Sequence, residues 1–481
     1  MASATGEQQQ RSGGLRRELR FWEAIALSIA IMAPTAAMAL NGVGIAGLIG
    51  RAVPLAFLFA LVGVLFVSYA FSMLSREVSH SGSVYALTGF TLGARAGFLA
   101  GWALLGTYLC FTVASSAEVG LFFSSFLAST GISDTADWIW IALVSAALIS
   151  FIAAGDIRVA TRSLLTMEGI SVTLIVILVV VIFAKLIGGS APAGHESSLA
   201  DAFKLPSGTS LDAVATAAVF GFLSFAGFEG AAALGEETDE PRRNIPRALF
   251  LAPLSMGIFY FFVILAQTLG FGTNEAGVAA FAGSSSPLGE LSKEYVGAGL
   301  EDAINLGATI SAFASALGTA TAGSRVLYAL SRDSLTSSPL ARVSPRSGAP
   351  LGALALVMAI GVGGLIGQRI AGTNAVNAFF YPGTIGVLSL MVAYIATNLG
   401  GIKHLFFGAV KKPIWQIAFP VLGIAFLCLT IYKNVHGAVA PYSHFPWYVL
   451  AWLVVGGLII AAAPGVAKRV GERLTSELEA R

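Results

Sequence analysis

Hydrophobic positions along this chain gather in long uninterrupted stretches, separated by short polar segments. A helix needs roughly 20 mainly apolar residues to cross the hydrocarbon core of a bilayer. Stretches of this kind predict twelve membrane-spanning segments. The predicted segments are 22–50, 52–74, 96–128, 138–155, 162–187, 212–234, 246–271, 301–330, 351–369, 373–398, 414–434 and 446–464.

Composition supports the same class of protein. Hydrophobic residues make up 56% of the chain and charged residues 11%, whereas a soluble domain carries about 25% charged residues. An ordinary soluble enzyme, a disordered chain and a fibrous protein are therefore excluded, and an all-α polytopic protein of the lipid bilayer is predicted. The net charge of +2 gives no indication of nucleic-acid binding. Cys110 and Cys428 lie in apolar runs without metal-ligand spacing.

The distribution of Lys and Arg predicts the orientation. With the N-terminus in the cytoplasm, 22 of the 28 Lys and Arg residues fall inside and 6 fall outside. This agrees with the rule that cytoplasmic loops carry the excess of positive charge. We therefore expect a cytoplasmic-membrane protein with both polar tails, 1–20 and 466–481, in the cytoplasm. The chain shows no phosphate-binding G-x-x-x-x-G-K-[ST] motif, so ATP-driven transport is not indicated.

The first predicted segment is too long for one straight crossing. Its 29 residues would span about 43 Å at 1.5 Å per residue, against a hydrocarbon core of about 30 Å. Pro34 stands in its middle, where it removes a backbone donor and pushes Ala33 towards extended geometry. A helix break at Pro34 is one interpretation, and a simple proline kink is the other.

The sixth segment contains a second candidate break. Gly221 and Gly227 bracket its centre, Gly230 follows, and Glu229 places a carboxylate within the apolar run. Close helix packing explains the small residues equally well, but an acid inside the membrane is costly and usually functional.

Interrupted helices at matching positions of two halves indicate a transporter site near the bilayer midplane. A half-helix that begins near Thr35 directs free N–H groups at an anion. A half-helix that ends near residues 223–226 presents carbonyl groups to an ammonium. An α-amino acid carries both groups, so it is the candidate ligand.

At the level of motifs, the chain resembles the amino acid–polyamine–organocation permeases, which have the LeuT-type fold. The specific motifs are 225–229 (FAGFE), 236–248 (EETDEPRRNIPRA) and 324–333 (SRVLYALSRD). Weaker matches are Ser68-Tyr69-Ala70 with 81–85 (SGSVY), and Gly101-Trp102. Together they cover most of the chain from 22 to 400.

The resemblance implies an inverted repeat of five plus five helices, at 21–200 and 201–400, with two additional helices in 401–465. It also implies that a small amino acid or amine binds between segments one, three, six, eight and ten. The chain departs from the family pattern in three places. Pro34-Thr35-Ala36 replaces Gly-Ser-Gly, Leu223 stands at the aromatic gate with Phe222 and Phe225 beside it, and Ser171 stands at a common lysine position. A lysine-based proton switch is therefore excluded.

The candidate substrate-binding residues combine the matched positions and their neighbours. They are Ala33, Pro34, Thr35, Ala36, Tyr108, Phe222, Leu223, Ser224, Phe225, Ala226 and Gly227. Tyr108 belongs to the site only if its helix is suitably rotated, and core packing is the alternative.

Three acids, Glu118, Glu168 and Glu229, lie inside apolar segments and are candidates for coupling transport to an ion. Glu168 and Ser171 share a helix face. Ser311, Ser315 and Thr319 recur every four residues on another helix face, and hydroxyl groups suit a hard cation such as Na⁺. Structural hydrogen bonding of the acids and helix packing by the serines are the open alternatives.

The predicted function is secondary active transport of amino acids by alternating access, with proton symport preferred. Amino acid–amine exchange and sodium symport are alternatives, and a non-transporting nutrient sensor on the same fold is an alternative of another class. No cofactor, metal or obligate partner is expected, and the protein is expected to be a monomer or a homodimer.

Overall fold

A computed structural model describes residues 20–77, 83–155, 157–192, 194–195, 197–234, 238–334, 339–344, 347–408, 410–462 and 465. Every regular element in these ranges is an α-helix or a 3₁₀ helix, which confirms the all-α prediction. The two predicted tails lie outside the described residues except for Arg20.

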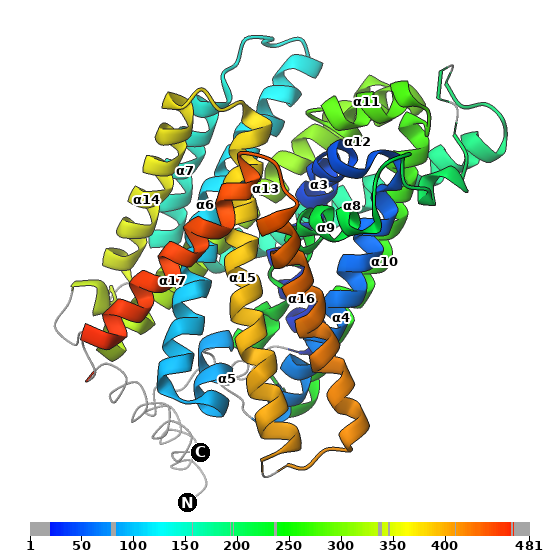
Figure 1. Cartoon of the computed structure of the whole chain (residues 1–481). Coiled ribbons are helices and arrows are strands. Elements are labelled where there is room, and N and C mark those ends of the chain that lie inside the picture. The colour runs from blue at the N-terminus through cyan, green and yellow to red at the C-terminus, as the bar shows by residue number, and fades with distance from the viewer. Residues whose placement is uncertain are drawn as a thin grey trace, which may run out of the picture.

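The helices form a single bundle (Figure 1). Their bounds are α2 Phe21–Met32, α3 Pro34–Ile49, α4 Val53–Glu77, α5 Ser83–Leu92, α6 Ala94–Ser129, α7 Trp138–Ala154, α8 Ile157–Ile187, α9 Leu211–Phe225, η3 Phe228–Leu234, α10 Pro241–Phe271, α11 Glu275–Gly283, α12 Pro287–Tyr295, α13 Ala298–Ser334, α14 Leu351–Ile370, α15 Ala375–Phe406, α16 Ala418–His436 and α17 Phe445–Ala462. Each predicted segment coincides with one of these helices or with a pair of consecutive ones. The short helices α5, α11 and α12 lie between the predicted segments.

Ten helical stretches in the described ranges are long and apolar enough to cross a membrane, with Pro34–Glu77 as a single stretch. The apolar helix Trp138–Ala154 is not among these ten stretches, because its 17 residues fall just short of the length required. The count of twelve crossings and the inverted repeat therefore stay predictions.

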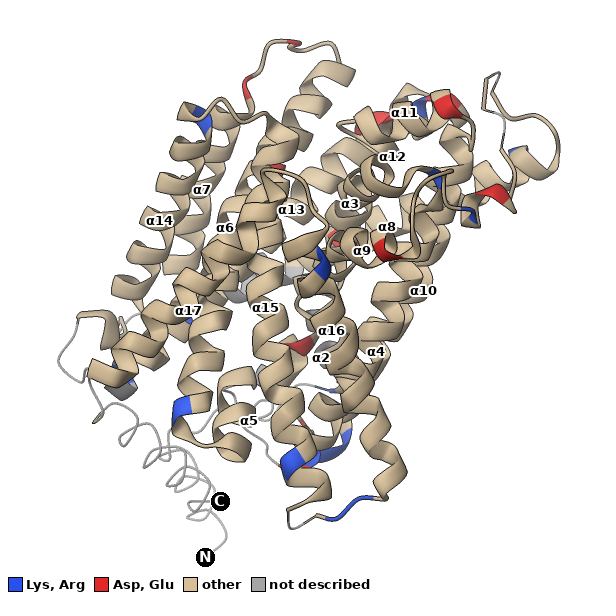
Figure 2. Cartoon of the chain, viewed as in Figure 1, with Lys and Arg blue, Asp and Glu red and all other residues tan. Residues whose placement is uncertain are grey.

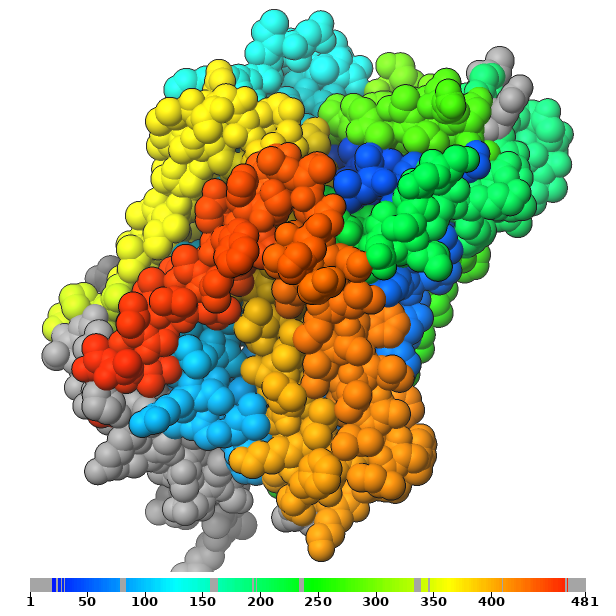
Figure 3. Space-filling view, in the orientation of Figure 1, coloured from blue at the N-terminus to red at the C-terminus, as the bar shows by residue number. Residues whose placement is uncertain are grey.

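Helix α6 lies at the centre of the packing and contacts both α13 and α15 along their length. Small residues permit these close approaches. A Cβ at Gly386 of α15, for example, would lie 2.6 Å from the Phe111 ring of α6. Helix α17 crosses α6 and α15 on the outside of the bundle (Figure 3). Its exposed side chains include Trp447, Leu450 and Leu458, which are suited to contact with lipid.

Charged residues gather near the two ends of the bundle (Figure 2). The end that carries α5 shows Lys and Arg. Arg76 lies in the last turn of α4, and Lys403 lies in the last turn of α15. The opposite end, around α11 and the loop after α6, carries most of the acids. Lys and Arg also occur at that end, for example Arg369 beside Asp137 and Lys293 beside Glu301, and the orientation of the bundle in the membrane stays a prediction.

Candidate functional site

The first predicted segment is interrupted at Ala33, between α2 and α3. Ala33 has φ 45° and ψ 62°, and Pro34 is the first residue of α3. The left-handed conformation costs a non-glycine residue roughly 1–2 kcal/mol. Because a left-handed residue separates two helices here, the segment contains a true break rather than a proline kink.

The sixth segment is interrupted after Phe225. Ala226 is extended, Gly227 has φ 102°, and the chain continues as the 3₁₀ helix η3. A Cβ at Gly227 would lie 2.4 Å from Cγ2 of Ile31, and a Cβ at Gly230 would lie 2.4 Å from Cδ1 of the same residue. Glycine is required at Gly227 both by the backbone conformation and by the approach of α2.

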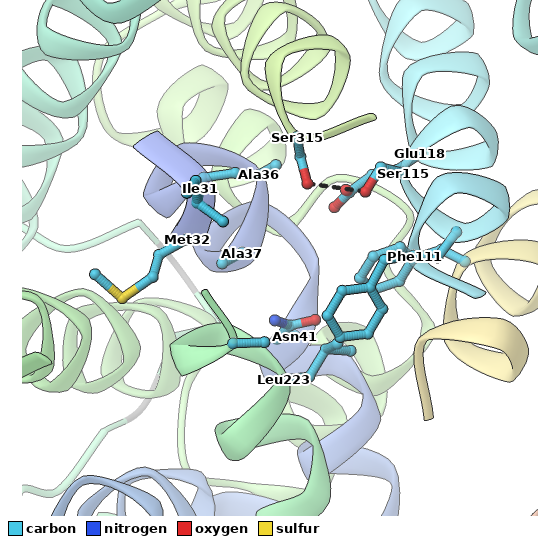
Figure 4. A pocket seen from close by; sticks show the side chains of 14 residues that line it. Ile31, Met32, Ala36, Ala37, Asn41, Phe111, Ser115, Glu118, Leu223 and Ser315 are labelled. Atoms are coloured by element: carbon cyan, nitrogen blue, oxygen red, sulfur yellow. Dashed lines mark hydrogen bonds between the residues drawn. The ribbon is translucent and has the colours of Figure 1, made fainter. Parts of the chain in front are cut away.

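A cavity of about 40 Å³ lies between the two breaks and the neighbouring helices. Figure 4 shows Ala36 and Ala37 of α3 on one side and Phe111 of α6 on another. The lining residues are Ile31, Met32, Ala33, Ala36, Ala37, Asn41, Phe111, Ala114, Ser115, Glu118, Leu223, Ala226, Ser315 and Phe379. The walls are mainly apolar, and their only ionisable group is Glu118.

The backbone donors at the start of α3 are already paired within the protein. The Thr35 N–H donates to Oε1 of Glu168 at 2.9 Å, and the Ala36 N–H donates to Oγ of Ser311 at 3.1 Å. The Ala37 N–H donates to the Ala33 carbonyl at 3.0 Å, and Pro34 has no N–H. The predicted anion-binding end of this half-helix therefore holds the side chain of Glu168.

Glu118 and Glu168 face the first break from two helices. Glu118 is 2% exposed, and its Oε1 has no hydrogen-bond partner in the part of the chain that the structure describes. The two carboxyl groups lie close enough to interact electrostatically. Next to Glu118, the hydroxyls of Ser115 and Ser315 join α6 to α13 at 2.9 Å (Figure 4).

Glu229 serves the second break in a different way. Its Oε2 accepts hydrogen bonds from the Gly227 N–H at 3.1 Å and from the Tyr394 hydroxyl of α15. The Tyr108 hydroxyl of α6 lies near this carboxyl group. Glu229 thus ties the turn after α9 to α15 and lies outside the cavity lining.

The structure distributes the other predicted site residues among several surroundings. Ala33, Ala36, Leu223, Ala226 and Ser315 line the cavity. Thr35 and Ser311 lie at the start of α3 on the side of α8 and α13. Phe222 packs towards Gly63, Phe225 packs against Tyr260, and Ser171 packs against Gly307. Ser224 accepts a hydrogen bond from Nδ2 of Asn41 at 2.7 Å, and Thr319 lies 3.5 Å from Thr112.

Eight of the cavity residues were not predicted from the sequence, and Asn41, Phe111 and Phe379 are the most informative of them. Phe111 and Phe379 supply the aromatic walls that Leu223 does not. Asn41 carried a usable signal, because an amide about two turns beyond the Pro34 break is unusual in so apolar a run.

The described ranges contain no group of three or more His, Cys, Asp or Glu side chains placed to hold a metal ion. Cys110 and Cys428 are free thiols.

Comparison with known proteins gives a consistent result. The family model described as amino acid permease matches residues 23–462. The low-affinity putrescine importer PlaP of Escherichia coli strain K12 is 26% identical over 81% of each chain. The branched-chain amino acid permease BcaP of Bacillus subtilis strain 168 is 26% identical over 73% of each chain. The methylthioribose transporter of the same organism is 24% identical over 74% of this chain and 77% of its own length.

Proposed function

The chain belongs to the amino acid permease family, and on this premise we propose that it carries small amino acids or amines across the cytoplasmic membrane as a proton-coupled symporter. The relatives are transporters rather than enzymes, and the chain is a multi-pass membrane protein of that family. One observation carries the proposal. A cavity lies where two interrupted helices meet, and the carboxyl group of Glu118 lines it.

Alternating access is the mechanism we propose. The pairs α2–α3 and α9–η3 would move against α6, α7, α13 and α14. The breaks at Ala33 and Gly227 supply the backbone points proposed for such motion, because both residues have positive φ and lie at the junction of two helices. Ser28 of α2 joins the two moving units: its hydroxyl donates to the Phe228 carbonyl at 3.2 Å and accepts from the Ala231 N–H at 2.9 Å.

Proton coupling is proposed to act through Glu168, with Glu118 beside it. The ionised Glu168 carboxylate is a strong acceptor for the Thr35 N–H, and charge-assisted hydrogen bonds of this kind are roughly twice as strong as neutral ones. Protonation of Glu168 would weaken its hold on α3. A proton arriving at this position would therefore favour release of the half-helix, which links ion binding to the motion.

Transport by the purified protein in liposomes tests the proposal. A panel of labelled amino acids and amines is offered with an inward proton gradient, with an inward sodium gradient, and with neither. We expect uptake that depends on the proton gradient. Uptake driven by the sodium gradient alone would show that the coupling ion is Na⁺ rather than the proton. Accumulation only against an internal counter-substrate would indicate exchange. No uptake or counterflow of any compound would overturn the transport function and favour the sensor alternative.

A further inference from the structure

The cavity offers two unpaired hydrogen-bond acceptors to a ligand, and its side-chain O–H donors come from the Ser115–Ser315 pair, in which one hydroxyl already donates to the other. Oε1 of Glu118 and Oδ1 of Asn41 are buried, belong to residues that line the cavity, and have no hydrogen-bond partner among the described residues. Their residues are 2% and 1% exposed, respectively. An unpaired buried acceptor costs about 1–3 kcal/mol. A ligand that donates to both oxygens would remove this cost at two places.

The orientation of the Asn41 amide follows from its neighbours. The Ser224 hydroxyl donates to the Phe220 carbonyl at 3.3 Å. The Ser224 oxygen is then available as an acceptor, and Nδ2 of Asn41 donates to it at 2.7 Å. This assignment uses the donor end of the amide and leaves Oδ1 as the free end.

The backbone around the cavity also presents acceptors rather than free donors. The N–H groups of Thr35 and Ala36 are taken by Glu168 and Ser311, and the Gly227 N–H is taken by Glu229. Helices α2 and α9 both end at the cavity, and a helix C-terminus exposes carbonyl groups with partial negative charge. No Lys or Arg is among the residues that line the cavity.

From this balance we propose that the site takes aliphatic amines without a carboxylate, with diamines as the best fit. Glu168 is a carboxylate of the protein that stands where a substrate carboxylate would bind the start of α3. One ammonium group would bind Glu118 and the other end would bind Asn41, with the carbon chain against Phe111, Leu223 and Phe379. This inference rests on the proposed transport function and narrows its substrate.

Two matched pairs of compounds separate the substrate class from transport itself. Each pair differs by one carboxylate: 1,4-diaminobutane against ornithine, and 3-methylbutylamine against leucine. Inhibition of labelled uptake in proteoliposomes is measured for all four. We expect the compound without the carboxylate to be preferred about tenfold or more in each pair. An equal or opposite preference would overturn the inference while leaving transport intact, and absence of any uptake would overturn both.

Two variants test the residues. Glu118→Gln removes the charge that faces the ammonium, so KM for 1,4-diaminobutane should rise about tenfold. Glu275→Gln, an exposed change on α11, should leave this KM unchanged.

Glu168→Ala frees the Thr35 N–H, so the ratio of ornithine to 1,4-diaminobutane uptake should increase. This ratio is independent of how much variant folds. An unchanged KM in Glu118→Gln, or an unchanged ratio in Glu168→Ala, would contradict the proposed roles.

Discussion

The three buried acids of this chain have different surroundings and therefore different expected roles. Glu118 has an unpaired oxygen and lines the cavity. Glu168 pairs with the backbone at the start of α3. Glu229 is held by hydrogen bonds from the Gly227 N–H and the Tyr394 hydroxyl. A carboxylate with several donors stabilises a fixed geometry, whereas a carboxylate with a free oxygen is available to a ligand. The sequence placed all three inside the membrane but did not distinguish them.

Glu168→Gln should separate proton coupling from substrate binding. The glutamine keeps an acceptor oxygen for the Thr35 N–H, so α3 should stay in place, but the amide cannot exchange a proton. Uptake driven by an imposed proton gradient should fall about tenfold or more, whereas counterflow of labelled against unlabelled substrate should stay within about twofold. Both are measured in the same proteoliposomes, with Glu275→Gln as control. Full gradient-driven uptake by the variant would contradict the role of Glu168.

Glu290, on α12 outside the predicted spans, should make stability depend on pH. Burial raises the pKa of its carboxyl group above the ordinary value of 4.5; the Ser284 hydroxyl opposes this shift, and the charges of Glu294 and Glu301 add to it. The folded state therefore holds its proton to higher pH than the unfolded state does. The contribution of Glu290 to the free energy of unfolding is fully present below pH 4.5, and it declines as the pH rises through the pKa of the folded state.

Glu290→Gln should remove the part of the decline in stability with rising pH that is due to this carboxyl group. The amide oxygen can still accept the bond from the Ser284 hydroxyl, which measures 2.7 Å in the native chain. The thermal midpoint of the purified protein, followed from pH 4.5 upward, should then fall less steeply than that of the native chain. Parallel curves for the two proteins would show that Glu290 is not the titrating group.

At the scale of elements, the sequence predicted the helices well because the membrane imposes a simple length and polarity requirement. Proline at Pro34 and glycine at Gly227 marked both breaks, since these residues act on their own backbone. The occupants of the α3 N-terminus were not predictable in the same way. Glu168 and Ser311 are separated from Thr35 and Ala36 by 133 and 275 positions, so their contacts depend on tertiary packing.

The rotation of each helix about its axis was the other missing quantity. Phe222 and Phe225 flank Leu223 in sequence, but they point at α4 and at Tyr260 rather than into the cavity. Phe111 and Phe379 line it instead. Helices that are apolar all round give little periodic signal, so the face that α6 or α15 presents to the site had to come from the structure.

Ser28→Ala should weaken the connection between α2 and η3. The change leaves the Phe228 carbonyl and the Ala231 N–H without their partner, at about 1–3 kcal/mol for each buried group. Hydrogen exchange should increase in residues 21–32 and 228–234 but not in α13. Ser124→Ala is a matched control, because that hydroxyl bonds only to Leu121 on its own helix. Equal exchange in both variants would show that Ser28 does not couple the elements.

At the scale of the whole molecule, the bundle has a wide apolar circumference and charged ends. Exposed apolar side chains occur on α7, α8, α16 and α17, among them Phe151, Val180 and Leu458. A soluble protein rarely exposes contiguous apolar surface of this extent. The same feature explains the low charged fraction of 11%, because charges are needed only where the bundle meets water.

The orientation of this bundle in the membrane is the prediction that belongs to the whole chain. A variant in which Cys110 and Cys428 are replaced by alanine receives one new cysteine, either Thr135→Cys after α6 or Asp239→Cys before α10; both positions are exposed. The excess of Lys and Arg places Asp239 in the cytoplasm and Thr135 outside. In intact cells a membrane-impermeant maleimide should label the cysteine at 135 and should label that at 239 only after permeabilisation. Each variant is the control for the other. The reverse labelling pattern would invert every loop of the predicted topology. Labelling of both positions in intact cells would mean that an even number of crossings separates them.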